Sequence, residues 1–256
     1  CSALFAILVA NLTLIMVVNA DSYQSMPGNN HTLAKEAKSE RGTISTYDGI
    51  VLARSVLDDD GSYSRIYPAG DLASHVVGYV SQQYGTSGIE DAYNDTLKGQ
   101  ENFATWTDVL NDMAGIGTTG NDVTLTINSK IQQAAQDAIA GKKGAAVVMD
   151  PKTGAILAMA SAPTYDAANF EQVIAAANAD SSDSSLINRA TGNLYAPGST
   201  FKMVTLSTAL EDDVANESTT FSSPGTIDIG NASVSNFNHM SYGTQTLEQA
   251  TWWSAN

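Results

Sequence analysis

The feature that most limits how this chain can fold is a nearly charge-free stretch at its start. The run from Ser2 to Ala20 contains no acidic or basic residue and is interrupted only by Asn11, Thr13 and Asn19. Its length is close to the roughly 20 residues that span a bilayer as a helix. No clear small-x-small cleavage site precedes Asp21, so the pattern favours an uncleaved transmembrane anchor over residues 1–20. A buried core helix is the alternative.

The remainder has the composition of a globular protein with more than one domain. A chain of 256 residues exceeds the usual size of one domain, and its 43% hydrophobic and 15% charged residues are unlike those of a disordered chain. The net charge of −15 argues against nucleic acid or an anionic membrane surface as the main partner, because both select for Lys and Arg. The single cysteine, Cys1, excludes an intrachain disulfide. Because the chain begins with Cys1 instead of Met, we expect its true N-terminus to be missing.

Residues 21–118 are expected to form a mixed α/β domain of short elements. A polar connector occupies residues 21–40, and Arg41 to Ala53 then contains two β-prone runs around Asp48-Gly49, which is a hairpin signal. A helix is predicted from Ile89 to Leu97. The segment 115–120 matches a dinucleotide-binding glycine pattern by letter, but a helix-like segment (106–113) precedes it and a strand (122–127) follows, the reverse of the required order. We interpret it as a flexible joint between domains.

Residues 119–256 are predicted to form an α+β domain. Asn128 or Ser129 should cap a helix that Gly141 ends. Two apolar runs, 145–150 and 155–160, are joined by a short turn and predict a buried antiparallel hairpin in the middle of a sheet. Helices before and after this hairpin suggest an antiparallel sheet with helices on both faces. Further predictions are a helix over 167–179, short strands or loops over 219–234 and a helix from Thr246.

A serine and a lysine three residues apart are the strongest chemical signal in the chain. Pro197-Gly198 ends one segment, and Ser199-Thr200-Phe201-Lys202 opens an apolar, helix-like stretch. Residues i and i+3 share a helical face, so the Lys202 amine can reach the Ser199 hydroxyl. A neutral amine can take the serine proton and make it a nucleophile. Burial and the positive helix N-terminus both favour the neutral amine, and the same N-terminus favours an oxyanion. An ordinary surface lysine is the alternative.

The chain resembles the class B penicillin-binding proteins, monofunctional peptidoglycan D,D-transpeptidases, and most closely those of actinobacterial type. The resemblance covers nearly the whole chain and rests on seven segments in order: Arg41–Ala53, His75–Tyr79, Gly88–Glu90, Asp122–Ile127, Asp150–Gly154, Asn188–Ala190 and Pro197–Lys202. It implies a pedestal domain followed by a β-lactamase/transpeptidase-like domain. The chain ends on two tryptophans and Ser254-Ala255-Asn256, so truncation is expected at the C-terminus as well.

Three motifs form the catalytic cleft of this family: Ser-x-x-Lys, Ser-x-Asn and Lys-Ser/Thr-Gly. The first maps onto Ser199 and Lys202, and the second onto Ser254 and Asn256. The third is absent. Lys152-Thr153-Gly154 matches it by letter, but this tripeptide precedes the serine and lies in a predicted hairpin turn. We therefore expect a chain of this extent to be inactive or nearly so.

The resemblance also implies roles for these residues. Ser199 would attack the carbonyl between the last two D-alanines of a peptidoglycan stem peptide, and Lys202 would take its proton. Ser254 would relay a proton to the leaving D-alanine, while Asn256 would bind the peptide amide and help hold Lys202. The backbone N–H of Ser199 would form half of the oxyanion hole, and penicillins would acylate the same serine.

The expected setting is a single-pass protein of the cell membrane with most of its chain outside. Its partners would be stem peptides, β-lactams and membrane proteins of a division or elongation complex. No metal or organic cofactor is implied, since His31, His75 and His239 show no ligand spacing and structural roles are expected for them. The alternatives are a serine β-lactamase, a β-lactam sensor, and a non-catalytic membrane-tethered scaffold.

Overall fold

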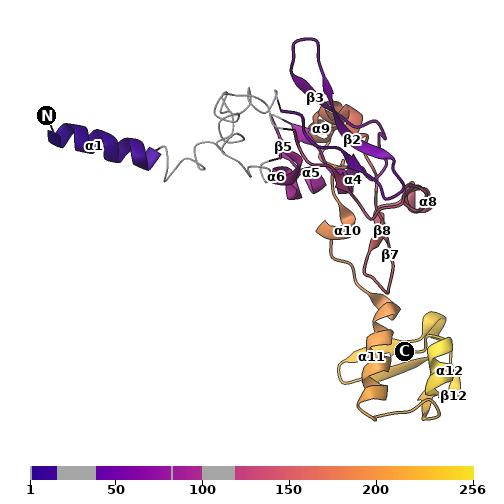
Figure 1. Ribbon diagram of the computed structural model, residues 1–256. Helices are drawn as coiled ribbons and strands as arrows, with labels where there is room; N and C mark the ends of the chain where they lie inside the picture. The colour runs from indigo at the N-terminus through magenta and orange to yellow at the C-terminus, as the bar shows by residue number, and fades with distance from the viewer. Residues whose placement is uncertain (1, 16–38, 82, 100–118) are drawn as a thin grey trace. The chain divides into compact units, whose positions relative to one another are not determined.

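The computed structural model describes residues 2–15, 39–81, 83–99 and 119–256 (Figure 1). It divides into two compact units, residues 1–193 and 194–256. The first unit contains a mixed α/β domain and a helix-covered hairpin, and the second contains the Ser-x-x-Lys and Ser-x-Asn segments. The predicted connector (21–40), the 106–113 helix and the 115–120 joint lie wholly or mostly outside the described residues.

The first helix, α1 (Ser2–Thr13), covers part of the predicted membrane anchor. At 1.5 Å per residue its 12 residues extend about 18 Å, less than the roughly 30 Å of a bilayer core. Within the described ranges, no helix combines the length and the apolar character needed to cross a membrane. The described residues therefore do not confirm the anchor, and residues 16–20 fall outside them.

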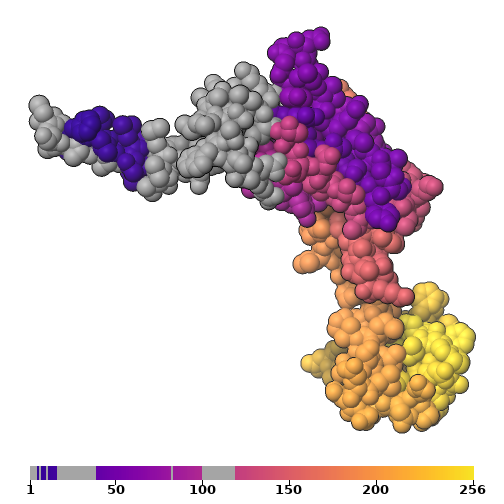
Figure 2. Space-filling model, viewed as in Figure 1, coloured from indigo at the N-terminus to yellow at the C-terminus, as the bar shows by residue number. Residues whose placement is uncertain are grey.

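A four-stranded sheet forms the base of the mixed domain, in the order β3 (Tyr63–Ile66), β2 (Val51–Leu57), β1 (Ile44–Ser45), β6 (Val123–Thr124). β1 and β2 are antiparallel and are joined through Asp48-Gly49, where the Thr46 N–H donates to the Ile50 carbonyl at 2.9 Å. This confirms the predicted hairpin. β6 pairs in parallel with β1 and is shorter than the strand predicted over 122–127. The β2–β3 turn projects from its unit in Figure 2.

Short helices and a small β-ribbon follow: α4 (Ser74–Val77), β4 (Val80–Ser81), β5 (Gly85–Thr86), α5 (Gly88–Ala92) and α6 (Asn94–Leu97). The single helix predicted from Ile89 to Leu97 is wrong, because Tyr93 leaves the helical conformation (φ −113°, ψ 27°) and separates α5 from α6. The hydrophobic core joins the sheet, these helices and a later segment through Ile44, Leu52, Val77, Leu97 and Phe170.

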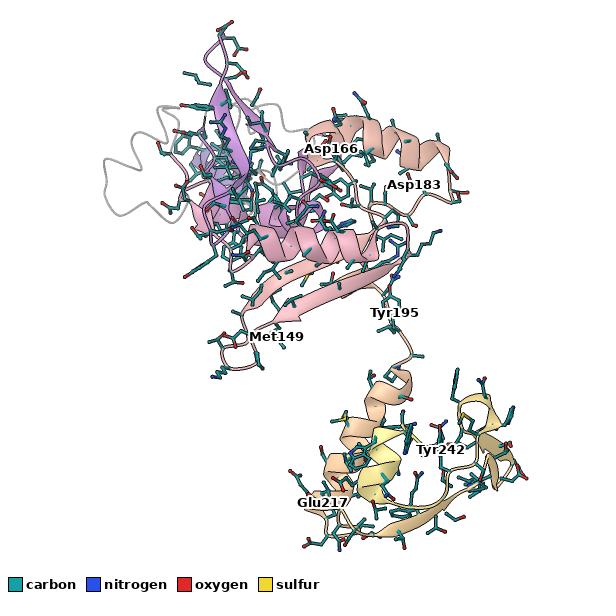
Figure 3. All side chains as sticks on the ribbon, turned by 90° about the vertical axis from the view of Figure 1, so that its right-hand side faces the viewer. Met149, Asp166, Asp183, Tyr195, Glu217 and Tyr242 are labelled. Atoms are coloured by element: carbon teal, nitrogen blue, oxygen red, sulfur yellow. The ribbon has the colours of Figure 1, made fainter. Side chains whose placement is uncertain are left out.

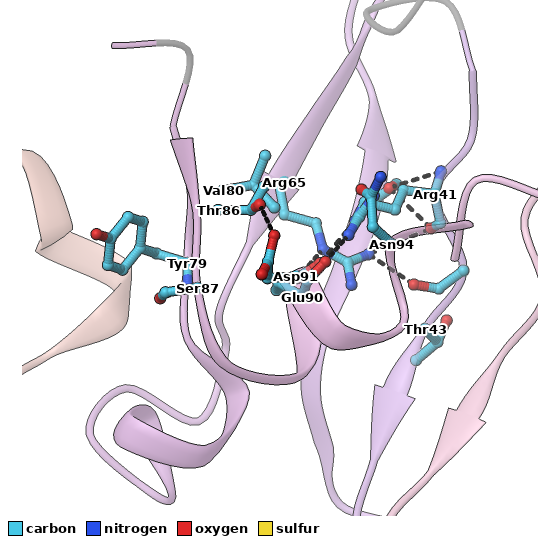
Figure 4. Close-up of polar contacts among 12 residues, drawn as sticks. Arg41, Thr43, Arg65, Tyr79, Val80, Thr86, Ser87, Glu90, Asp91 and Asn94 are labelled. Atoms are coloured by element: carbon cyan, nitrogen blue, oxygen red, sulfur yellow. Dashed lines mark hydrogen bonds and ion pairs between the residues drawn. The ribbon is translucent and has the colours of Figure 1, made fainter. Parts of the chain in front are cut away.

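A buried ion cluster fixes the sheet to α5 (Figure 4). The Glu90 side chain is fully buried and accepts from Arg41 Nε at 2.6 Å and from Arg65 Nε at 2.7 Å. Arg41 also donates to Asn94 Oδ1 and to the Glu90 carbonyl, and Arg65 Nη1 donates to the Gly42 carbonyl at 2.7 Å. Losing one member of such a cluster leaves a buried charge without its counterion, so the cluster holds the start of the domain in place.

The hairpin of β7 (Gly144–Met149) and β8 (Ile156–Ala162) packs beside α8 (Ser129–Ile139). Asn128 caps α8 by accepting from the N–H groups of Lys130 and Ile131, which settles the predicted choice between Asn128 and Ser129. Within the described ranges, β7 and β8 form a two-stranded sheet. The prediction that both strands are buried in mid-sheet is wrong for β7, because α8 packs on Ala158 and Ala160 of β8 while Met149 at the turn end is exposed (Figure 3).

The chain then passes through η3 (Ala167–Asn169), α9 (Phe170–Ala179) and α10 (Arg189–Gly192). The helix predicted over 167–179 is confirmed, with a 3-10 first turn. His75 contacts the segment before α10 through Nε2 and the Ser185 carbonyl at 2.6 Å, so it has the structural role expected of it. Burial lowers the pKa of His75, which favours its neutral form.

The second unit opens with η4 (Gly198–Phe201) and α11 (Lys202–Glu211). Two antiparallel ribbons follow, one of β9 (Thr220–Ser223) with β12 (Gly243–Thr246) and one of β10 (Thr226–Ile229) with β11 (Ala232–Ser235). A 3-10 turn, η5 (Phe237–His239), links the ribbons, and α12 (Leu247–Trp252) ends the unit. Tyr242, labelled in Figure 3, stacks on Trp253 with ring centroids 6.0 Å apart. The region predicted as short strands or loops contains three strands, and the predicted final helix is confirmed.

Candidate active site

Ser199 lies in the first turn of the helix that carries Lys202. Gly198 opens this turn at φ +56°, a conformation that favours glycine, and residues 198–201 form a 3-10 helix that continues directly into α11. The Lys202 N–H bonds back to the Ser199 carbonyl. Residues i and i+3 eclipse each other in a 3-10 helix, so Ser199 and Lys202 lie on one face, as their spacing predicts.

The Lys202 amine is held by Ser254, which is 52 residues away in sequence. Its Nζ donates to the Ser254 carbonyl at 2.6 Å and lies 3.1 Å from Ser254 Oγ. Desolvation lowers the pKa of Lys202, in the direction that a proton-accepting amine requires. The structure therefore brings together the lysine of the first motif and the serine of the second.

Ser254 is presented by the C-terminal end of α12. Thr246 and Gln249 form a capping box at the start of this helix, with reciprocal hydrogen bonds of 3.0 and 3.2 Å. At its end, the Ser254 N–H donates to the Thr251 carbonyl and the Ala255 N–H to the Ala250 carbonyl. These two bonds, with Ser254 at φ +52°, make a Schellman motif.

Asn256 is fixed by residues at and after the end of β11. Its backbone N–H donates to Asn236 Oδ1 at 2.7 Å, and its Nδ2 donates to the Ser235 carbonyl at 2.6 Å. One donor of the Asn256 side chain is thus bonded to Ser235, and among the described residues no hydrogen bond joins Asn256 to Lys202. The expected contact in which Asn256 helps to hold Lys202 is therefore not formed here.

Two further observations complete the geometry. Within the described part of the chain, the Ser199 hydroxyl makes no hydrogen bond to Lys202, Ser254 or Asn256. Lys152-Thr153-Gly154 forms the β7–β8 turn, where Asp150 accepts from the Lys152 N–H at 2.9 Å and from Thr153 Oγ1 at 2.9 Å. The prediction that this tripeptide belongs to a hairpin turn is confirmed.

Sequence reasoning missed Ser235 and Asn236 as partners of the site. Both lie in a polar stretch of short strands, in which one asparagine looks like the next. The only sequence signal that points to them is the alternation along β11, which ends at Ser235 immediately before the buried Asn236. That signal does not identify Asn256 as the partner.

Comparison with known sequence families gives two matches that together cover most of the chain. Residues 41–123 match the penicillin binding protein A dimerisation domain, and residues 144–256 match the penicillin binding protein transpeptidase domain. The second match contains Ser199, Lys202, Ser254 and Asn256. The fold and the paired motifs are thus those of a transpeptidase-like domain that follows a dimerisation domain.

Individual relatives agree with these matches. The peptidoglycan D,D-transpeptidase PbpA of Mycolicibacterium smegmatis is 35% identical over 236 residues, which are 87% of this chain and 48% of that protein. The D,D-transpeptidase domain of a peptidoglycan glycosyltransferase from Eggerthella lenta has a TM-score of 0.75 and 69% identity, covering 84% of this chain and 47% of that one. The penicillin G acyl-enzyme complex of Mycobacterium tuberculosis penicillin-binding protein A has a TM-score of 0.74 and 33% identity, covering 85% and 54%.

The chain belongs to the penicillin-binding protein family, as its sequence predicts. It spans about half the length of the PbpA relatives that it matches.

Proposed function

We propose that this chain carries the first part of the active site of a serine-type peptidoglycan D,D-transpeptidase, in which Ser199 is the nucleophile. The contact of Lys202 with Ser254 supports this most directly, because it joins two motifs that are far apart in sequence into one site. The M. smegmatis relative is named a peptidoglycan D,D-transpeptidase, and the M. tuberculosis neighbour was determined as a penicillin G acyl-enzyme. Stem peptides and β-lactams are the corresponding proposed ligands.

In the proposed reaction, Ser199 Oγ attacks the carbonyl carbon of the penultimate D-alanine and its proton passes to the neutral Lys202 amine. The C–N bond then breaks, and the terminal D-alanine leaves as an amine that takes a proton through Ser254. An amine of a second stem peptide attacks the resulting ester, forms the cross-link and releases Ser199 with its proton restored. Asn256 binds the substrate amide. The N–H of Ser199 lies in the first helical turn, ahead of the first intrahelical bond, and is proposed to donate to the oxyanion.

The rest of the proposal concerns the setting of this site. We propose a membrane anchor over residues 1–20, a pedestal domain over 21–118 and a transpeptidase domain over 119–256 with an antiparallel sheet between helices. The catalytic part would then lie outside the cell membrane, where it would meet proteins of a division or elongation complex. The match of residues 41–123 to a dimerisation domain favours an additional binding role for the pedestal.

The test is labelling of the full-length protein with fluorescent penicillin. Ser199→Ala is expected to abolish covalent labelling, because the acyl bond forms on that hydroxyl. Ser207→Ala, on an exposed position of α11, is the matched control and should label like the unmodified protein.

Labelling that survives Ser199→Ala would refute the assignment of the nucleophile. Complementation in cells whose growth depends on this protein distinguishes an enzyme from a scaffold. Loss of growth with Ser199→Ala supports catalysis, whereas full complementation by this variant supports the scaffold alternative.

A further inference from the structure

Asn236 is a buried polar residue that the catalytic motifs do not include. It follows β11 directly, and only 5% of its surface is exposed. Its backbone N–H donates to the Gly225 carbonyl at 3.1 Å. Gly225 is itself tightly enclosed, since a Cβ there would lie 2.2 Å from the His239 carbonyl oxygen. The loop around Asn236 is therefore folded closely enough to determine where its side chain points.

The Asn236 amide group can adopt only one of its two orientations. Nδ2 lies 3.1 Å from Ser223 Oγ, 3.0 Å from the Pro224 carbonyl and 2.9 Å from the Met240 carbonyl. Two of these partners are carbonyls, which accept and never donate, so the NH₂ group must face them. Oδ1 therefore faces the opposite way, where it accepts from the Asn256 N–H at 2.7 Å.

This last hydrogen bond connects the buried network to the catalytic segment. Asn256 is anchored twice, through its N–H to Asn236 Oδ1 and through its side chain to the Ser235 carbonyl. Ser254 lies two residues earlier and offers its carbonyl and hydroxyl oxygens to Lys202. The Schellman motif fixes the segment on one side of Ser254, and the bond to Asn236 fixes it on the other.

We propose that Asn236 is a positioning residue for the transpeptidase site. It holds the Ser254-Ala255-Asn256 backbone so that Ser254 stays in contact with Lys202 and the Asn256 side chain keeps a constant direction. This inference rests on the proposed function. It adds that acylation depends on a residue 18 positions before Ser254 whose side chain, among the described residues, forms no hydrogen bond with Ser199 or Lys202.

The decisive comparison is between Asn236→Ala and Ser223→Ala in the full-length protein. Ser223 is also buried and belongs to the same network, but its hydroxyl contacts Asn236 and not Asn256. Stopped-flow labelling with fluorescent penicillin, at a temperature where both variants are folded, gives the acylation rate constant separately from the affinity of the initial complex. Thermal unfolding of each variant is measured in parallel.

Asn236→Ala is expected to lower the acylation rate constant at least tenfold, while Ser223→Ala keeps it within twofold although its melting temperature falls. The proposal is overturned if Asn236→Ala acylates within twofold of the unmodified protein, or if both variants lose the same factor, as general loosening of the unit would cause. Failure of the proposed function is a separate result, because the unmodified protein would then show no labelling that depends on Ser199.

If Asn236→Ala does not fold, Asn236→Asp decides the question. A protonated carboxyl has the shape of the amide and can still donate to one carbonyl while accepting from Asn256, whereas the carboxylate can only accept. The acylation rate constant of this variant should therefore fall with rising pH through an ionisation that the unmodified protein lacks, at pH values where the variant remains folded. A pH profile that matches that of the unmodified protein would overturn the proposal.

Discussion

Ser254 occupies a backbone position that glycine would fill at lower energy. It is the left-handed residue of a Schellman motif, with φ +52°, and its hydroxyl oxygen lies 3.1 Å from Lys202 Nζ. A left-handed conformation costs a residue with a side chain about 1–2 kcal/mol. Glycine loses about 0.5–1 kcal/mol more chain entropy on folding, so glycine should be favoured here by about 0.5–1 kcal/mol.

Two substitutions separate this backbone cost from the chemistry of the hydroxyl. Ser254→Ala and Ser254→Gly both remove the hydroxyl and keep the carbonyl that accepts from Lys202, and they differ only in the Cβ. We expect Ser254→Gly to be more stable than Ser254→Ala by about 0.5–1 kcal/mol, or roughly 1–4 °C in melting temperature for a domain of this size. Both variants should lose acylation equally, by about a hundredfold or more, because both lack the hydroxyl that is proposed to transfer the proton.

The assays are thermal unfolding and fluorescent-penicillin acylation of the full-length variants. Equal stability of the two variants would refute the claim that Ser254 is strained. Acylation near that of the unmodified protein in either variant would refute a role for the hydroxyl. If both expectations hold, the site retains a serine at a cost in stability, as is common at functional positions.

Two further predictions concern the first unit. Glu90→Gln should destabilise the full-length protein by about 3–5 kcal/mol in denaturant unfolding, because Arg41 and Arg65 would lose the anion that they share. Asp91→Asn, at the neighbouring exposed position, is the control and should change the stability by less than about 1 kcal/mol. Asp48 accepts from the Ser129 hydroxyl and from the Ser129 N–H, the latter at 2.9 Å, and these bonds lower the pKa of Asp48 below its usual 3.8. The contribution of the Asp48 carboxylate to stability is therefore complete above pH 3.8 and is lost as the pH falls. In acid unfolding curves, the difference in stability between the unmodified protein and Asp48→Asn should shrink below that pH. A difference that stays constant would contradict this assignment.

Local signals in the sequence predicted most elements of this fold. Asn128 caps α8 as expected, and the hairpin over 144–162 follows from its two apolar runs. Where prediction failed, the decisive contacts were not local. The exposure of Met149 depends on which neighbours cover β7, which a single sequence does not specify, and no pattern in the sequence marks the break at Tyr93.

The site divides in the same way. The three-residue spacing of Ser199 and Lys202 was enough to predict that the two side chains share one face, because both residues lie in one helical turn. The resemblance to a family placed Lys202 and Ser254, 52 positions apart, in one cleft, but the contact that it implied for Lys202 was with Asn256. The bond from Asn256 to Asn236 was missed altogether, since neither residue belongs to a pattern that predicts pairing.

In the proposed reaction, the position of Lys202 between two helix ends would allow one amine both to accept and to release a proton. At the start of α11, the positive end of its own helix disfavours the ammonium, and desolvation lowers the pKa of Lys202 further. At the end of α12, the Ser254 carbonyl accepts from Nζ at 2.6 Å, and this bond is stronger when the amine is charged. In that reaction, the first effect would favour a neutral amine before Ser199 attacks its substrate, and the second would stabilise the ammonium once the proton has arrived. One of these effects on the protonation of Lys202 comes from the start of α11 and the other from the end of α12. The separation between the two helices therefore sets the balance between neutral amine and ammonium. For this reason the residues that fix the chain beyond α12 would affect the proton transfer.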